Sequence, residues 1–178
     1  MEKKDLKPAG VFKYFEEICQ VPRPSKKEEK MIAYLKAFGA KHNLETKVDE
    51  AGNVLIKKPA TPGKENLQTV VLQSHIDMVC EKNNDVQHDF LTDPIETEID
   101  GEWLKAKGTT LGADNGIGVA TELAILADDS IEHGPLECLF TVDEETGLTG
   151  AFALQEGFMS GDILLNLDSE DEGEIFIG

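Results

Sequence analysis

In the stretch "VVLQSHIDMV" (Val70–Val79), an apolar run is followed by two ionisable side chains, which are unusual in the interior of a sheet. Its first half is typical of a strand buried inside a sheet. His75 and Asp77 then follow, two residues apart. Because side chains alternate along a strand, these two are expected to point to the same side. The stretch therefore predicts a buried strand that ends in an imidazole and a carboxylate on one face.

The remainder of the chain alternates between helix-like and strand-like patterns. Ser25 and Glu28 have the spacing of a capping box and predict a helix start at Ser25. The runs "LECLFTV" and "DILLNL" are typical of strands buried on both faces. Between strand and helix, residues 80–116 are polar and poor in periodicity. The pattern predicts an α/β fold, with a mixed, largely parallel sheet and helices on both faces. The expected helices span residues 8–20, 25–39, 117–129 and 150–157, and the expected strands lie within 44–58, 70–74, 136–142 and 162–167.

Acidic residues follow three of the expected strands. Taken singly, each has an ordinary explanation, such as a satisfied histidine, a solvated turn or a helix N-cap. Taken together they indicate a binding site, because ligands bind beyond the carboxyl ends of strands in α/β sheets. We expect these groups to converge at one rim of the sheet. The residues are His75 and Asp77 after the first strand, Asp143, Glu144 and Glu145 after the second, Asp168 after the third, and Asp114 before a helix in "GADNG".

Carboxylates crowded at one rim repel each other unless a cation lies between them. Carboxylate and imidazole donors without thiolate suit zinc, manganese or cobalt. The candidate ligands His75, Asp114, Glu145 and Asp168 exceed the three protein ligands of a usual catalytic zinc site, so we expect two ions. Of the adjacent acids, one can then bind metal while Glu144 acts as a general base. Asp77 can accept the second ring N–H of a metal-bound His75.

A calcium site without catalysis is the main alternative. The run "DSEDEG" (168–173) begins like a calcium-binding loop, with acids at its first, third and fifth positions and glycine at its sixth. A strand precedes this run, where such a loop needs a helix. The motifs HExxH, GxSxG and Walker A do not occur in the sequence. The sequence thus favours a two-metal hydrolase over a calcium-binding module.

Composition narrows the class of partner. The formal net charge of −18 disfavours binding to nucleic acids and anionic membranes. The sequence has no 18-residue apolar run, and its first ten residues lack the apolar core of a signal peptide. The cysteines Cys19, Cys80 and Cys138 form no CxxC pair, and Cys19 and Cys138 lie in apolar runs that indicate core positions. A reducing cytoplasm is the expected location.

Four motifs, "QSHIDMV", "KGTTLGADNGIG", "TVDEETG" and "LLNLDSEDEGEI", together resemble the co-catalytic zinc peptidases related to aminoacylase and glutamate carboxypeptidase. Within that family, residues 83–118 are similar to bacterial aminoacyl-histidine dipeptidases. The resemblance implies a cytosolic homodimer that hydrolyses small peptides with two Zn²⁺ ions, for which Mn²⁺ or Co²⁺ can substitute. A related tripeptide aminopeptidase or deacylase is the alternative within the family.

The resemblance also implies a role for each candidate residue and a cis peptide bond at Asp114–Asn115. Family members continue into a lid domain and then supply a last histidine ligand. Residues 1–178 therefore look like an N-terminal segment of the catalytic domain that is inactive alone. In the implied arrangement, His75 and Asp168 bind one zinc ion, Glu145 binds the other, and Asp114 binds both. Glu144 is the implied general base, and Asp77 is implied to orient His75.

Overall fold

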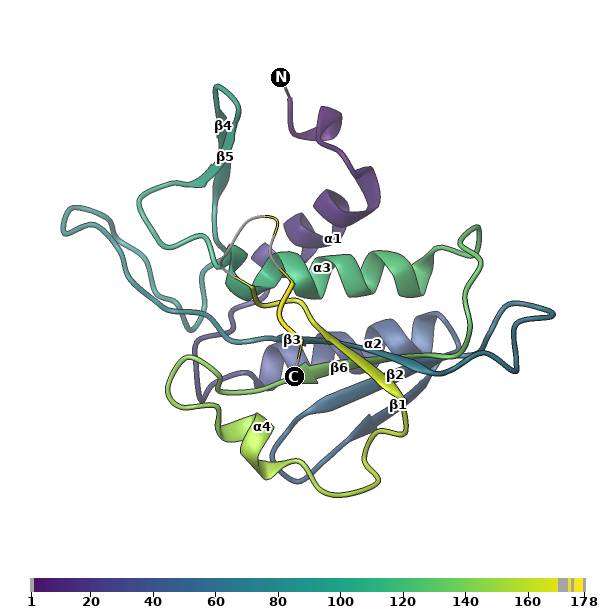
Figure 1. The fold of residues 1–178 in the computed structure, drawn as a ribbon. Helices are drawn as coiled ribbons and strands as arrows, with labels where there is room; N and C mark the ends of the chain where they lie inside the picture. Colours follow the sequence, from purple (N-terminus) through teal and green to yellow (C-terminus); the bar gives the residue numbers. More distant parts are fainter. Residues whose placement is uncertain (1, 170–172, 174, 178) are drawn as a thin grey trace.

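The computed structural model of the chain describes residues 2–169, 173 and 175–177. It contains a mixed five-stranded sheet in the order β1-β2-β6-β3-β7 and a separate two-stranded sheet, β4-β5 (Figure 1). In the larger sheet β3 pairs in parallel with β6 and β7, whereas β2 pairs antiparallel with β1 and β6. The strands are β1 (Glu45–Val48), β2 (Val54–Lys58), β3 (Val70–His75), β4 (Thr97–Asp100), β5 (Trp103–Ala106), β6 (Leu136–Thr141) and β7 (Ile163–Asn166).

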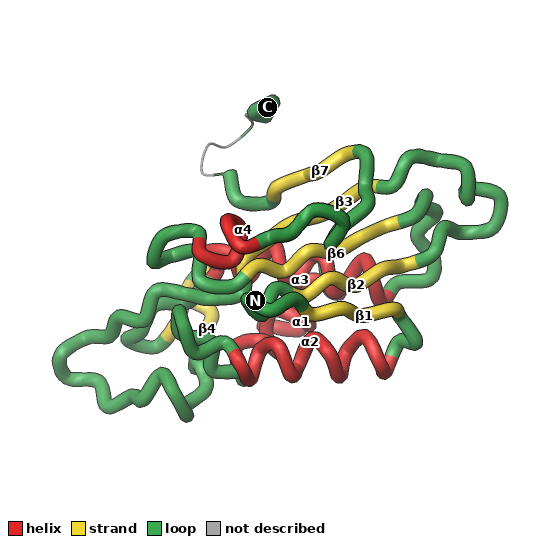
Figure 2. Tube along the Cα trace, turned by 90° about the horizontal axis from the view of Figure 1, so that it is seen from below, coloured by secondary structure: helices red, strands yellow, loops and turns green. Residues whose placement is uncertain are grey.

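Helices pack on both faces of the larger sheet, as the sequence predicts. The helices α1, α2 and α3 cover one face, where their apolar side chains form the main core with Ile56, Leu72 and Phe140 of the sheet (Figure 2). The short α4 lies on the other side of the sheet (Figure 1). The segment after it packs against Leu55 and Val71 through Leu154, Phe158 and Met159. The helices are α1 (Ala9–Cys19), α2 (Glu29–Lys41), α3 (Ala113–Ala127) and α4 (Thr149–Ala153), preceded by a 3₁₀ turn at Lys3–Asp5.

The parallel strands set the position of the polar rim. In the register of β3 and β6, His75 lies beside Thr141, so both strands end at the same edge. The strand β7 runs in the same direction, with Asn166 beside Gln73. Because the carboxyl ends of parallel strands meet at one edge, the segments after β3, β6 and β7 emerge together. The expected convergence of strand ends is confirmed.

The predicted capping box at the second helix is wrong. The helix α2 begins at Glu29, and no side chain caps it. The Ser25 hydroxyl instead donates to Asp77 Oδ2 at 2.7 Å. A Glu28 oxygen accepts the backbone N–H of Asp143 at 2.9 Å. Both side chains thus bind groups distant in sequence, and these bonds replace the local cap.

The long polar stretch contains a hairpin that its weak pattern does not reveal. Its strands, β4 and β5, join through a turn at Gly101, where φ is +63°. Their side chains alternate only between exposed and half-buried, because the hairpin projects beyond α3 and away from the larger sheet (Figure 1). With so little burial, hydrophobic alternation is faint.

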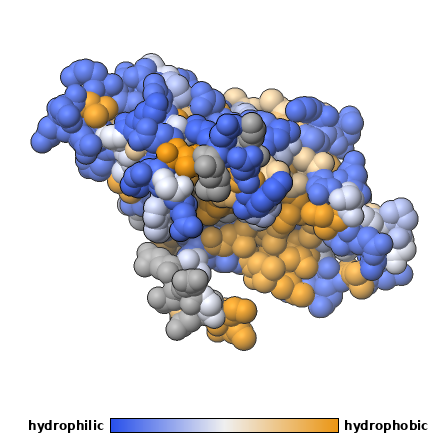
Figure 3. Space-filling model, turned by 90° about the horizontal axis from the view of Figure 1, so that it is seen from above, coloured by the Kyte–Doolittle hydropathy of each residue, from blue (hydrophilic) through white to orange (hydrophobic). Residues whose placement is uncertain are grey.

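The strand β7 departs from its predicted burial. Whereas all six residues of β6 are buried, all four of β7 are exposed, including Leu164 and Leu165 at 48%. The reason is position, because β7 is the last strand of the sheet among the described residues. Apolar side chains also gather on one part of the surface seen from above (Figure 3). Among the helices that the structure describes, none is both long enough and apolar enough to cross a membrane.

Candidate metal centre

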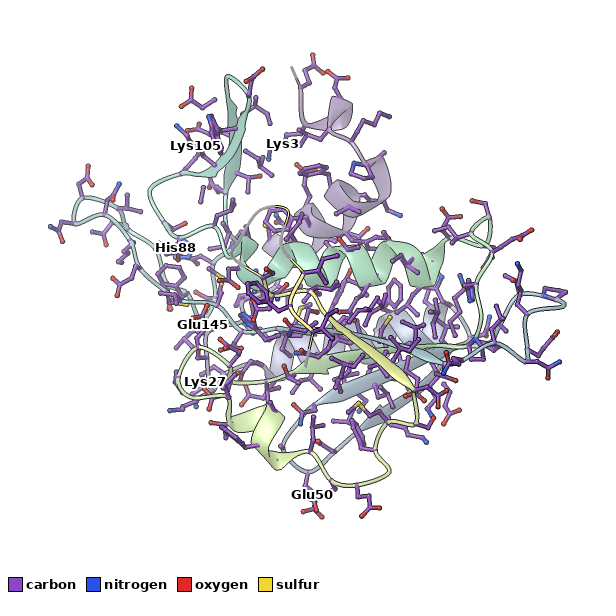
Figure 4. The ribbon with its side chains drawn as sticks, viewed as in Figure 1. Lys3, Lys27, Glu50, His88, Lys105 and Glu145 are labelled. Carbon is purple, nitrogen blue, oxygen red and sulfur yellow. The ribbon has the colours of Figure 1, made fainter. Side chains whose placement is uncertain are left out.

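His75 lies at the middle of a cluster of carboxylates. Its ring is 1% exposed, and its Nε2 atom is 3.1 Å from Asp114 Oδ1. The same nitrogen is 3.8 Å from Glu144 Oε2 and 3.9 Å from Asp168 Oδ2. Glu145 completes the cluster, with a carboxylate oxygen within 4.8 Å of ligand atoms of His75 and Asp114. Figure 4 shows Glu145 at the end of the sheet, near the first turn of α3.

Asp77 lies behind the cluster and holds it in place. Its carboxylate is fully buried, and Oδ1 is 3.3 Å from His75 Nδ1. It accepts the backbone N–H groups of Glu144 at 3.0 Å and Glu145 at 3.2 Å. The hydroxyl of Ser25 is a further donor to it. One side chain therefore contacts the imidazole and also ties down the loop that carries both glutamates.

The loop after β6 has a second buried anchor. Asp143 has φ +50°, which turns the chain sharply at the strand end. Its N–H donates to Glu28, and its Oδ1 accepts the hydroxyl of Thr146 at 2.6 Å. The chain closes through the N–H of Leu148, which donates to the carbonyl of Glu144 at 2.9 Å. The loop is thus fixed mainly through its backbone, and the side chains of the two glutamates remain available.

Asp114 reaches the cluster from the start of α3. Gly112, with φ +68°, turns the chain into the helix, and Asp114 and Asn115 depart from helical geometry. The peptide bond between them is cis, as the resemblance implies. The Asn115 amide donates to the carbonyl of Leu167 at 3.3 Å, just before Asp168. The first turn of α3 is thereby tied to the end of β7.

The charges of the cluster shift its pKa values in opposite directions. Burial lowers the pKa of His75, but Asp77, Asp168 and Asp114 outweigh it and raise that pKa from 6.5 to about 9. Burial raises the pKa of Asp77, but the hydrogen bonds from His75, two backbone N–H groups and Ser25 prevail and lower it from 3.8 to about 2.

The three carboxyl groups in front of His75 have the opposite shift. Burial raises the pKa values of Glu144, Glu145 and Asp168, His75 acts against it, and neighbouring carboxylates add to the rise. Such repulsion falls when a cation lies between the groups.

Three sets of donor atoms are close enough to hold an ion. Two contain His75, one with Asp114 and Glu145 and the other with Glu144 and Asp168, and the third consists of the buried carboxylates of Glu28, Asp77 and Asp143. Imidazole nitrogen with carboxylate oxygens fits zinc and its neighbours in the transition series. Asp77 already accepts backbone N–H groups, so its expected role is to support His75 rather than to bind an ion. The donor chemistry thus fits a divalent cation in front of His75.

The sequence predicted the residues that face the cluster and, behind it, Asp77, but not the other side chains that support it. Three side chains in the connection between α1 and α2 form hydrogen bonds to segments of the centre, namely those of Arg23, Ser25 and Glu28. One signal was available, since Arg23 is the sole arginine of the chain and lies between two prolines. The calcium-like run at 168–173 includes three acids outside the described residues, at positions 170, 171 and 172.

Comparison with known proteins identifies the family of the chain. The model of "Peptidase family M20/M25/M40" matches residues 71–173, more than half of the chain. The cytosol non-specific dipeptidase of Escherichia coli is 52% identical over 99% of this chain and 36% of its own length. The crystal structure of aminoacylhistidine dipeptidase from Vibrio alginolyticus has a TM-score of 0.94 and 56% identity, over 97% of this chain and 35% of that chain. The structure of aminopeptidase PepT from Bacillus cereus has a TM-score of 0.77 and 26% identity, over 91% of this chain and 43% of that chain.

The chain spans about a third of the length of the two dipeptidases that it resembles. The residues that match the family model extend from β3 to beyond Asp168 and so include every candidate ligand. The chain belongs to peptidase family M20/M25/M40.

Proposed function

We propose that the chain forms the metal-binding part of a dipeptidase that cleaves dipeptides, aminoacyl-histidine substrates among them. The observation that carries this proposal is the cluster of one imidazole and four carboxylates at the rim, with Asp77 behind it. The two relatives with over half their aligned residues in common are both named dipeptidases. Their names differ in breadth, one non-specific and one for aminoacyl-histidine, so the preference for histidine rests on the resemblance.

The proposed cofactor is a pair of Zn²⁺ ions, with Mn²⁺ or Co²⁺ as substitutes. His75 and Asp168 would hold one ion, Glu145 the other, and Asp114 both. The distances of 3.1 Å and 3.9 Å from His75 Nε2 to Asp114 and Asp168 support that assignment. A bound ion supplies a Lewis acid, which polarises the scissile carbonyl and lowers the pKa of water.

Glu144 is the proposed general base. Its pKa is raised by burial and by the neighbouring Asp168 and Glu145. A carboxylate with a raised pKa takes a proton from water more readily than an ordinary one. Glu144 would accept that proton and deliver it to the nitrogen of the leaving amine. Asp77 keeps the base in position through the backbone N–H of Glu144.

The test is Glu144→Gln in the complete polypeptide, with metal content measured beside dipeptide hydrolysis. We expect both ions to remain and kcat to fall by roughly 10²–10⁴-fold, because the amide cannot accept the proton. Glu156→Gln is the matched control, since it makes the same change at an exposed glutamate after α4 and should leave kcat unchanged. Near-normal turnover by the Glu144 variant with both metals bound would remove this residue from the mechanism.

The similarity to aminopeptidase PepT supports a second candidate of the same chemistry, an aminopeptidase. The resemblance of the sequence motifs implies tripeptides as its substrates. Parallel assays with carnosine, a dialanine and a trialanine separate the two. Faster cleavage of the dipeptides supports the first proposal, and a preference for the tripeptide supports the second.

The ligand count bears on the length of chain that is needed. Asp114 and Glu145 alone would leave one ion with only two proposed ligands, whereas catalytic zinc sites normally use three. We therefore propose that residues 1–178 are an N-terminal segment of the catalytic domain, completed by further polypeptide in a cytoplasmic homodimer. A zinc titration of residues 1–178 should show weaker binding than the complete polypeptide and no sustained hydrolysis. Two tightly bound ions with turnover would contradict this division.

A further inference from the structure

The sole arginine of the chain is buried behind the metal centre. Arg23 lies in the connection between α1 and α2 and is 2% exposed. The other sixteen basic side chains of the chain are all lysines. Burying a guanidinium is costly unless its donors are satisfied, so its partners indicate what it does.

The guanidinium joins two segments of the centre. Nη1 donates to the carbonyls of Ile76 and Asp77, both at 3.1 Å. Nη2 donates to the carbonyl of Gly112 at 2.6 Å. The first two carbonyls directly follow His75, and the third lies two residues before Asp114. One rigid planar group therefore spans the strand end with the imidazole and the loop with the candidate bridging carboxylate.

Two glycines provide the space for the guanidinium. A Cβ atom at Gly112 would lie 2.5 Å from Arg23 Nη2, and one at Gly116 would lie 2.7 Å from it. Gly112 also has positive φ, whereas Gly116 lies in the ordinary helical backbone of α3. The sequence "GADNG" thus places Asp114 between two positions that must lack a side chain while Arg23 is present.

The shape of the group matters as well as its charge. Arginine presents a fixed fork of donors, whereas lysine presents a single ammonium on a flexible stem. An ammonium at this position cannot hold both segments in the same planar arrangement. The cation also lies beside the candidate ligands without binding their carboxylates, since its described hydrogen bonds all go to backbone carbonyls.

We infer that Arg23 is a positioning residue, which fixes the separation of His75 and Asp114 and so determines how tightly the centre binds its metal. This inference rests on the proposed metal site. It assigns part of the metal affinity to a side chain whose described hydrogen bonds reach the candidate ligands only through the backbone carbonyls of neighbouring residues.

The test measures metal affinity directly in the complete, metal-free polypeptide. Zn²⁺ is titrated against a chromophoric chelator, and Co²⁺ binding is followed by its visible absorption, which reports ligand geometry. We expect Arg23→Met to weaken binding on the order of 10–100-fold, as loss of supporting groups around metal ligands does. Arg23→Lys should lie nearer to the methionine variant than to wild type. Wild-type affinity and spectrum in either variant would overturn the inference.

A control separates positioning from general destabilisation. Leu126 is buried at the far end of α3, about 15 Å along the helix from Gly116. Leu126→Ala should lower thermal stability while leaving the metal affinity and the Co²⁺ spectrum unchanged. An equal loss of affinity in this variant would attribute the effect to weakened folding and refute the positioning role.

Gly116→Ala provides a test that does not depend on removing the arginine. Its methyl group should displace the guanidinium and weaken metal binding in the wild-type background, but have less effect in the Arg23→Met background. Should Arg23→Met fail to fold, unchanged affinity in Gly116→Ala alone overturns the inference. A wild-type polypeptide that binds neither ion would instead refute the metal site itself.

Discussion

Two of the buried carboxyl groups, those of Asp77 and Glu122, lie in different regions and have opposite surroundings. At the rim, Asp77 accepts hydrogen bonds from two backbone N–H groups and a hydroxyl, and its pKa falls to about 2. Between α3 and the sheet, Glu122 is also fully buried, yet neither oxygen has a hydrogen-bond partner among the described residues. Burial raises its pKa well above 4.5. The nearby Ser74 hydroxyl and Cys138 thiol, which make no regular hydrogen bond to it, lower that pKa only in part.

Burial alone therefore does not decide whether a carboxyl group is ionised or how it contributes to the stability of the fold. Where donors surround the carboxylate, it stays ionised and orders the chain around it. Where donors are missing, ionisation is disfavoured and the group is held as a neutral acid. The first arrangement supports a charged site, and the second adds stability only while its proton is retained. Substitutions in the two regions should therefore act with opposite sign.

The largest effect is expected at Asp77. The variant Asp77→Ala leaves the N–H groups of Glu144 and Glu145 and the Nδ1 atom of His75 without their acceptor. Breaking such a buried network costs about 3–5 kcal/mol of unfolding free energy, measurable by urea denaturation of the metal-free protein. Because folding lowers the pKa from 3.8 to about 2, the ionised form stabilises fully above pH 3.8 and loses its effect as pH falls through 2. About 2 kcal/mol of the difference should disappear over that range.

A matched control is available in Asp129, whose side chain is 98% exposed. Asp129→Asn should change stability by no more than about 0.5 kcal/mol. A similarly small loss in Asp77→Ala would mean that the loop after β6 does not depend on this anchor.

Glu122→Gln should stabilise the protein at neutral pH. The folded state keeps the Glu122 proton while the unfolded chain releases it near pH 4.5, so wild-type stability falls as pH rises above that value. The amide carries no such dependence. The difference in unfolding free energy should be near zero at pH 4 and grow by up to about 1.4 kcal/mol per pH unit above it.

Glu98 in β4 is exposed and serves as the control for that pH series. The difference between wild type and Glu98→Gln should stay within about 0.5 kcal/mol at every pH. If Glu122→Gln gives an equally flat profile, Glu122 is ionised in the folded state and the contrast between the two regions fails.

The smallest effect on stability is expected at Asp168, which lies at the same rim as Asp77 but is partly exposed. Its side chain is 27% exposed, and its N–H donates only to the nearby Asn166 side chain at 3.1 Å. Asp168→Asn should alter the urea midpoint by an amount equivalent to about 0.5 kcal/mol or less, since it also relieves repulsion within the cluster. Zinc affinity should nevertheless fall by tenfold or more, because Asp168 is a proposed ligand. A large loss of stability would show that the end of β7 supports the fold as Asp77 does.

The rim could be predicted because its signals are local. The spacing of His75 and Asp77 indicates a shared face, and the acids after apolar runs mark the strand ends. Parallel pairing of β3 with β6 and β7 then brings those ends together. Each step uses only periodicity and the rule that parallel strands end at one edge.

Apart from Asp77, the supports of the rim could not be predicted, because their partners are distant in sequence. Arg23 binds carbonyls 53, 54 and 89 residues away, and Glu28 binds an N–H 115 residues away. The pattern at Ser25 favoured a local helix cap, whereas its hydroxyl instead donates to Asp77. The exposure of β7 was missed for a related reason, because an apolar run does not reveal whether its strand is central or at an edge.

The loop after β6 is anchored by its main chain, since Asp77 accepts the N–H groups of residues 144 and 145 rather than binding their side chains. Any amino acid but proline supplies such an N–H. Both positions are thus open to replacement without loss of the turn that presents them. For design, this makes position 145 a place to exchange the donor atom, and Glu145→His or Glu145→Cys would shift the metal preference from harder to softer ions on an unchanged backbone.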